Sequence, residues 1–209
     1  MTNTSNTSVE TVPELLFEAL HRLAEKLPKS LSYHSFDHTA EVLSYSRLFA
    51  LADECSTRDL QLLEVAATFH DLGFLVERSR HEEVGADVAS ALLTHVGGFS
   101  SEETEMVHDM ILDTKVRTAE GWNFKRISTR LSPYLLDADV SNFGRQAFLN
   151  KVELVRIELQ ALPTRAFYQG VVEMLDAHHW HSTYAKENLQ STKDINRARL
   201  LELIDKAGS

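Results

Sequence analysis

The chain has 209 residues, and its 31 Asp and Glu residues outnumber its 21 Lys and Arg residues, which gives a formal net charge of −10 at pH 7. This acidic balance argues against a general affinity for nucleic acid polymers, because that affinity comes from clustered Lys and Arg side chains. The length suits one domain, and no apolar run approaches the roughly 20 residues that cross a bilayer. A single cysteine, Cys55, fits a reducing cytoplasm. We therefore expect a cytoplasmic protein with no membrane segment.

Residues 1–10 are rich in Thr, Asn and Ser, which predicts a disordered tail. In residues 11–209, apolar side chains recur three or four positions apart, glycine and proline are few, and no strand series stands out. This pattern predicts a single all-α domain, a helical bundle. The predicted helices cover, in chain order, residues 13–27, 37–52, 57–70, 80–95, 101–113, 131–141, 144–162, 165–178 and 193–207, with the longest irregular connection at 114–130.

Two histidines four residues apart, His34 and His38, open the first of three segments that carry imidazole and carboxylate groups. If the helix begins just before His34, both rings lie on one face, and Asp37 lies near the amino end, where a carboxylate can cap. One ring could then bind a metal while the other approaches a substrate. Alternatively, both are partly exposed histidines at a helix start, since such pairs are common.

The second segment, His70-Asp71, follows the almost wholly apolar stretch 65–69. The pair is therefore expected at the inner end of a buried helix. An unpaired buried carboxylate costs several kcal/mol unless a cation compensates it. A divalent metal would supply that cation, and imidazole and carboxylate are ligands that such metals accept.

The third segment contains Asp137 and Asp139 between apolar neighbours. Side chains two residues apart on a helix point about 200° away from each other around its axis. Only one of the two aspartates can therefore face a site shared with His70-Asp71. The other is expected to cap a helix or to bond to backbone. Both could also be surface residues.

The set His38, His70-Asp71 and Asp139 resembles the pattern of the HD-domain superfamily of metal-dependent phosphohydrolases, over most of the chain. The resemblance implies an HD-type helical bundle with a buried metal site in which these four residues hold one divalent metal. In binuclear members the aspartate of the doublet, here Asp71, bridges to a second ion. Asp139 is chosen over Asp137 because the family's late ligand usually follows a small residue, here Ala138.

Two other features refine the resemblance. Tyr33-His34 is similar to the Tyr-His start of many members, in which the histidine protonates the leaving group. The Glu-Asp pair of alarmone hydrolases is missing after Asp71, and the downstream His-His and Gly-Tyr-Pro signatures of cyclic-di-GMP hydrolases are missing as well. The stretches 110–115 and 136–144 are similar to the uncharacterised group called "predicted metal-dependent phosphohydrolase".

The resemblance implies hydrolysis of a phosphomonoester or phosphodiester, with nucleotides among the candidates, by a metal-activated water. A divalent metal with open positions can lower the pKa of a bound water from about 15.7 toward about 7. The expected cofactor is one or two ions of Mn, Fe, Ni, Co, Zn or Mg. The expected catalytic residues are His34, Asp71 and Lys115, with Lys115 and Arg117 as substrate-binding residues and His81 and His108 as candidate ligands of a second metal.

Two alternatives belong to other classes of function. A minority of HD-like proteins are di-iron oxygenases, which would require His81 or His108 as an additional ligand. A ligand-sensing helical module with a structural metal is the other alternative, and a homodimer is compatible with either. The tract His178-His179-Trp180-His181 lacks accompanying carboxylates, so capping, exposure or a wall of the substrate cleft is expected there rather than a metal site.

Overall fold

The computed structural model describes residues 12–207, and the tail predicted for residues 1–10 lies outside this range. Within it the chain is mostly helical, which confirms the all-α prediction. The α-helices are α1 (Val12–Lys26), α2 (Phe36–Ala52), α3 (Thr57–Phe69), α4 (His81–Val96), α5 (Ser101–Asp113), α6 (Ser132–Asp139), α7 (Phe148–Glu158), α8 (Arg165–Ala177), α9 (Thr183–Asn188) and α10 (Gln190–Ala207). Three short 3₁₀ helices are η1 (Leu72–Leu75), η2 (Arg78–Arg80) and η3 (Ser141–Gly144), and a hairpin pairs β1 (Arg117–Thr118) with β2 (Gly121–Trp122) in antiparallel.

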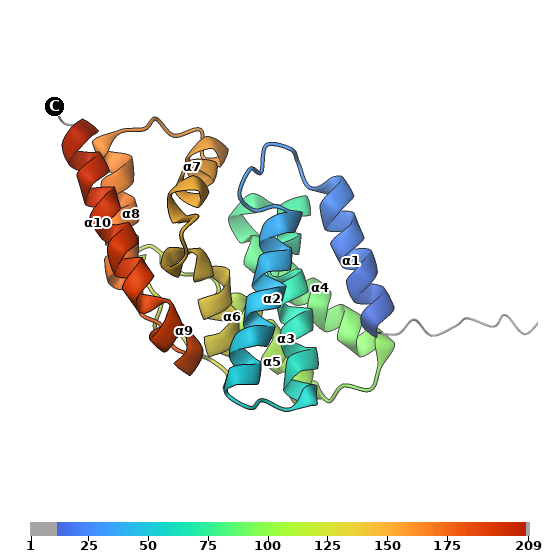
Figure 1. The fold of residues 1–209 in the computed structure, drawn as a ribbon. Coiled ribbons are helices and arrows are strands. Elements are labelled where there is room, and N and C mark those ends of the chain that lie inside the picture. Colours follow the sequence, from blue (N-terminus) through green and yellow to red (C-terminus); the bar gives the residue numbers. More distant parts are fainter. Residues whose placement is uncertain (1–11, 208–209) are drawn as a thin grey trace, which may run out of the picture.

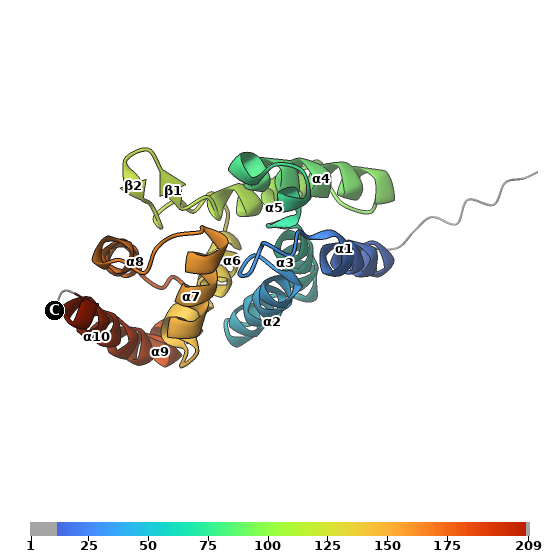
Figure 2. The same ribbon diagram turned by 90° about the horizontal axis from the view of Figure 1, so that it is seen from above.

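The helices form two groups on either side of α6 (Figure 1). In the first group α2 packs along α3, and α4 packs along α5. In the second group α10 packs against α8 and α9 (Figure 2), and α7 contacts η3. Helix α6 contacts α2, α3 and α5 of the first group, and η3, which follows it, contacts α7 and α10 of the second group. None of the described helices is both long and apolar enough to cross a bilayer.

Local sequence explains where the helices of the first group begin. Ser56 and Asp59 form a capping box at the start of α3, and Ser100 and Glu103 form another at the start of α5. Each box satisfies backbone N–H groups that a helix start would otherwise leave without partners. Fully buried apolar side chains of the core come from α2 to α6 and from the residue before α6: Phe49, Leu62, Leu63, Leu93, Met110, Ile111, Leu131 and Leu135. Helix α3 is therefore capped at its start and packed along its buried face.

The start of α2 differs from the one considered in the sequence, in which the helix begins before His34 so that His34 and His38 lie on one helix face. Ser35 is the N-cap with an extended backbone, and α2 begins at Phe36. His34 therefore precedes the helix. The backbone N–H groups of Tyr33 and His34 instead donate to the carboxylate of Glu158, at the end of α7.

Three further differences lie in the second half of the chain. The helix predicted at 144–162 is shorter in the structure, where it forms α7. It begins later than predicted because the side-chain amide of Asn196 donates to the carbonyls of Phe143 and Arg145 and holds these residues outside the helix. Helix α9 was not predicted; Ser182 caps it by accepting from the N–H of Ala185. The hairpin lies in the connection predicted as irregular, and strands of two residues are too short to show a sequence period.

Candidate metal centre

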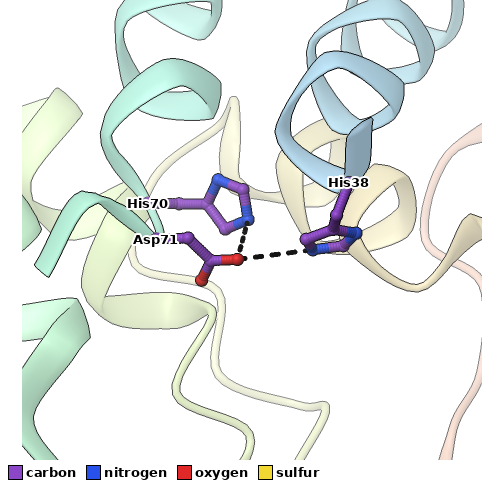
Figure 3. Close-up of side chains that lie close together, drawn as sticks. All are labelled: His38, His70 and Asp71. Atoms are coloured by element: carbon purple, nitrogen blue, oxygen red, sulfur yellow. Dashed lines mark ion pairs between the residues drawn. The ribbon is translucent and has the colours of Figure 1, made fainter. Parts of the chain in front are cut away.

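Three buried side chains from two neighbouring helices form what we call the His–Asp cluster: His38, His70 and Asp71 (Figure 3). His38 lies in the first turn of α2, His70 follows the last residue of α3, and Asp71 comes next in the chain. Asp71 Oδ2 is 3.3 Å from His70 Nε2 and 3.5 Å from His38 Nε2. One donor atom from each residue lies within 4.8 Å of the other two, so the cluster could hold a metal ion.

The hydrogen bonding of the cluster fits a bound cation. His70 Nδ1 lies 2.7 Å from the carbonyl oxygen of Ala67, so Nδ1 carries the proton and Nε2 points toward Asp71. Among the described residues, neither His70 Nε2 nor Asp71 Oδ2 has a hydrogen-bond partner. Buried polar atoms are nearly always paired, and nitrogen and oxygen donors at this separation suit a divalent metal. The residues present therefore fit the metal that the sequence predicts.

Electrostatics within the cluster are dominated by the pair His70 and Asp71. Burial opposes protonation of His70, but the carboxylate of Asp71 outweighs burial and raises the pKa of His70 from 6.5 to about 9. Burial likewise opposes ionisation of Asp71, and the charge of His70 outweighs it and lowers the pKa of Asp71 far below its usual range. A metal that binds here takes the place of the His70 proton, so metal uptake and proton release are coupled.

The structure separates the two aspartates of α6. Asp139 Oδ1 lies 3.1 Å from His38 Nε2 and 3.7 Å from His70 Nε2, beside the His–Asp cluster. Asp137 is fully buried and points to the start of α9, where it accepts hydrogen bonds from the backbone of His181 and Ser182 and from the Ser182 hydroxyl. One aspartate thus faces the cluster and the other bonds to backbone.

His34 approaches the same region from the segment before α2. Its Nδ1 lies 2.6 Å from Glu158 Oε1, and its ring stacks on Phe74. Burial lowers the pKa of His34, but the hydrogen bond with Glu158 and the charges of Asp71, Glu158 and Asp139 outweigh burial and raise it. Because the carboxylate of Glu158 takes Nδ1–H, Nε2 is the ring nitrogen that remains for another partner.

Glu158 is a residue that the sequence did not reveal. Its side chain is 1% exposed, and besides the ring of His34 it accepts from Arg78, 2.9 Å away. Burial raises the pKa of Glu158, but the hydrogen bond and charge of His34 outweigh burial and lower it to about 2. Glu158 is 124 residues from His34 in the chain, and no spacing pattern could connect the two.

The two histidines predicted as second-metal ligands lie in different places. His81 Nε2 is 3.7 Å from Asp71 Oδ1, because Gly73 and Gly85 let η1 and α4 approach closely. A Cβ added at either glycine would collide with backbone, that of His81 or of Phe69. His108 instead contacts Asp87 and Asp109, and the structure does not bring it to the His–Asp cluster.

The predicted substrate-binding residues also separate. Lys115 Nζ lies 2.6 Å from Glu83 Oε1, and this hydrogen bond raises the pKa of Lys115. Arg117 is exposed and its guanidinium lies 4.6 Å from the centre of the Trp122 ring. Arg117 and Trp122 line a cavity that also contains Asp71 in its wall, whereas Lys115 is not among the described residues that line this cavity.

A cavity of about 270 Å³ opens beside the His–Asp cluster. His34, Asp71, His81 and Asp139 line one side of it. The rest of the wall comes mainly from apolar side chains of α7, α8 and η3, together with Trp122 of the hairpin. A small molecule in this cavity would contact both the cluster and His34.

In the histidine tract after α8, one ring is buried among aromatic side chains. His178 is buried, packs edge-on against Phe124, Phe143 and Trp180, and accepts a hydrogen bond from Lys193 Nζ at 2.9 Å. Burial and the charge of Lys193 lower the pKa of His178 from 6.5 to about 2. The tract therefore joins α10 to the wall behind the cavity.

A pH dependence of stability follows from His178. The pKa of His178 in the folded state lies below its value of about 6.5 in the unfolded chain. Below about pH 6.5 the unfolded chain therefore binds a proton at His178, whereas the folded protein keeps this histidine neutral. Stability is fully present above that pH and is lost on acidification by about 1.4 kcal/mol per pH unit from this residue. The measurement is urea unfolding of the wild type and of His178→Gln between pH 5 and 7.5. The difference between their free energies of unfolding should change with pH by this slope. The variant His95→Gln, at an exposed position, is the control and should not show this change.

The chain was also compared with known proteins. A scan against protein-family models gave no match, and searches of curated proteins and of solved structures found no significantly similar protein. The case for a function therefore rests on the residues of the cluster and of the cavity.

Proposed function

We propose that the protein is a metal-dependent phosphohydrolase of the HD-domain type, acting on a small phosphate ester. The observation that carries the proposal is the His–Asp cluster itself. Two imidazoles and a carboxylate are buried within 4.8 Å of one another, and His70 Nε2 and Asp71 Oδ2 have no hydrogen-bond partner among the described residues. A cluster of this composition beside a cavity is expected to bind a metal and a substrate together.

In this proposal His38, His70, Asp71 and Asp139 hold the metal. When bound, the metal would polarise the phosphoryl oxygens and lower the pKa of a water molecule. Hydrolysis joins the water oxygen to phosphorus and breaks the bond between phosphorus and the leaving oxygen. His34 supports this step because, against the effect of burial, its hydrogen bond with Glu158 and the nearby carboxylates raise its pKa, which favours the protonated ring that can donate to the leaving oxygen.

Charge on the phosphoryl group would be balanced mainly by Arg117. It lines the cavity, whereas Lys115 is paired with Glu83 on α4. In the proposal Arg117 therefore takes over the catalytic and substrate-binding roles that the sequence predicted for Lys115. The ion pair of Lys115 with Glu83 instead connects α4 to the segment before the hairpin.

Glu158 is expected to act as a positioning residue through His34. Glu158→Gln should lower kcat about 10- to 100-fold, no more than the lower end of the roughly 10²- to 10⁴-fold range for general acid catalysis, because His34 itself remains. It should also move the alkaline limb of the kcat profile to lower pH, because the carboxylate that raises the pKa of His34 is gone. Glu153→Gln is the matched control on the same helix, since Glu153 contacts Arg156 and Tyr168 instead. A fall in kcat without the pH shift would contradict the assigned role.

The proposal is tested by elemental analysis of protein purified without chelator, combined with a panel of phosphomonoesters and phosphodiesters. About one equivalent of metal per chain is expected, with turnover that chelation abolishes and Mn²⁺ restores. Metal at this level without hydrolysis of any ester would overturn the proposal.

A second candidate, a di-iron oxygenase, is favoured by one observation. His81 lies 3.7 Å from Asp71, close enough for the pair to take part in holding a second ion. Iron at about two ions per chain, without ester hydrolysis, would move this candidate ahead. A single coordinatively closed metal would favour the ligand-sensing module instead.

A further inference from the structure

Two of the helices that line the cavity carry apolar side chains with the same spacing. Helix α7 contributes Phe148, Val152 and Val155, and helix α8 contributes Phe167, Val171 and Met174. Both sets follow the spacing i, i+4, i+7, which places three side chains on one helix face. Such faces normally close on each other to form core, yet here they border a cavity of about 270 Å³. The site therefore has an apolar half as well as a metal-binding half.

Few polar groups are available in the apolar half. Asn142 lines the cavity, but its amide donates to the hydroxyl of Tyr33. Lys151 also lines it, but its ammonium group lies 3.1 Å from Glu41. A sugar or nucleobase placed here would lose hydrogen bonds to water without gaining others, and burying an unsatisfied polar group is unfavourable. An alkyl or aryl group would lose none.

The size of the cavity sets the scale of the ligand. A cavity of roughly 150 Å³ is enough for benzene. The cavity of about 270 Å³ thus has room for one ring or a short branched chain in addition to a phosphoryl group. His34 lines the cavity beside Asp71 and Asp139, so its ring lies close to where the phosphoryl and apolar parts of such a molecule would join.

We infer that the substrate is a phosphate ester of an apolar alcohol or phenol, whose alkyl or aryl group lies between α7 and α8. This inference rests on the proposed function, because it names the leaving group of the reaction at the same site. Nucleotides and sugar phosphates are then poor substrates. Arg117 and Trp122, which line the cavity from the hairpin, would cover the bound ester.

Binding can be measured apart from turnover with phosphonates, which are not hydrolysed. Calorimetric titration of the metal-loaded protein should show phenylphosphonate binding at least about tenfold more tightly than methylphosphonate, since each buried carbon adds to affinity. Val155→Phe, which adds a ring to a half-buried position on the cavity wall, should remove this preference. Val88→Phe is the matched control on the exposed surface of α4. Met174→Phe is a second filling variant if Val155→Phe does not fold.

The same proteins are then assayed with phenyl phosphate, glycerol phosphate and a nucleoside monophosphate. Faster turnover of phenyl phosphate, lost in the filling variants and kept in Val88→Phe, would support the inference. Equal binding of the two phosphonates, or preferred hydrolysis of the nucleotide or glycerol ester, would overturn the inference and leave the phosphohydrolase proposal standing. A phenyl preference in binding without hydrolysis of any ester would overturn the proposed function and this substrate with it.

Discussion

Asp71→Asn is expected to reduce the metal affinity at least about 100-fold and the rate of ester hydrolysis about 10³-fold. The substitution keeps the shape of the side chain and removes only its charge. Asp71 is 4% exposed, and its Oδ2 lies within 3.5 Å of both imidazoles of the His–Asp cluster, so this oxygen is the common neighbour of the other two donors. A neutral amide would place an N–H group or a weaker donor at that position.

The measurement is metal content by elemental analysis, together with turnover at saturating Mn²⁺. Asp109→Asn is a matched control on α5, where the carboxylate is half-buried and contacts His108 outside the cluster. Circular dichroism of each variant establishes that it is folded. An Asp71→Asn protein that retains the full metal content would refute the ligand assignment, and one that loses metal but keeps its activity would refute the proposed reaction.

Asp137→Ala and Asp139→Ala are expected to separate stability from metal binding. Asp137 accepts from two backbone N–H groups and a hydroxyl at 2.7–3.0 Å, and it joins α6 to the cap of α9. Alanine leaves these buried donors without partners, at about 1–3 kcal/mol each, so we expect a loss of about 3 kcal/mol or more in the free energy of unfolding. The metal content per folded chain should remain that of the wild type.

Asp139→Ala should give the opposite result. The side chain of Asp139 is 20% exposed and lies 3.1 Å from His38, so its removal should weaken metal binding at least about tenfold and leave stability within about 1 kcal/mol. Urea unfolding and metal titration of both variants provide the comparison. If Asp137→Ala loses metal while remaining stable, the assignment of the two aspartates is reversed.

The link from sequence to structure is direct for the helices and for the His–Asp cluster. Apolar side chains three to four apart predicted most helices, because a helix must bury one face, and that periodicity is a local property. The apolar lead-in to His70-Asp71 likewise predicted a buried pair. The 200° angle between Asp137 and Asp139 is also local helix geometry, and it predicted that the two would face different surroundings.

Contacts between distant segments could not be predicted in this way. The carboxylate of Glu158 fixes the backbone of Tyr33 and His34 and so places His34 outside α2, although 124 residues separate the two. The position of His81 beside Asp71 depends on how closely α4 approaches η1 and α3, which the absence of a Cβ at Gly73 and Gly85 allows.

The sequence by itself determined that this is an all-α protein with a buried group of imidazole and carboxylate side chains, because helix periodicity and the cost of burying a charge are encoded in neighbouring residues. The resemblance points to Asp139, but only the tertiary structure shows which aspartate lies beside that group, which residue contacts His34, and that a cavity lined partly by α7 and α8 opens there. These depend on the packing of helices that are remote in the chain, where each contact is set by three-dimensional distance rather than by sequence spacing.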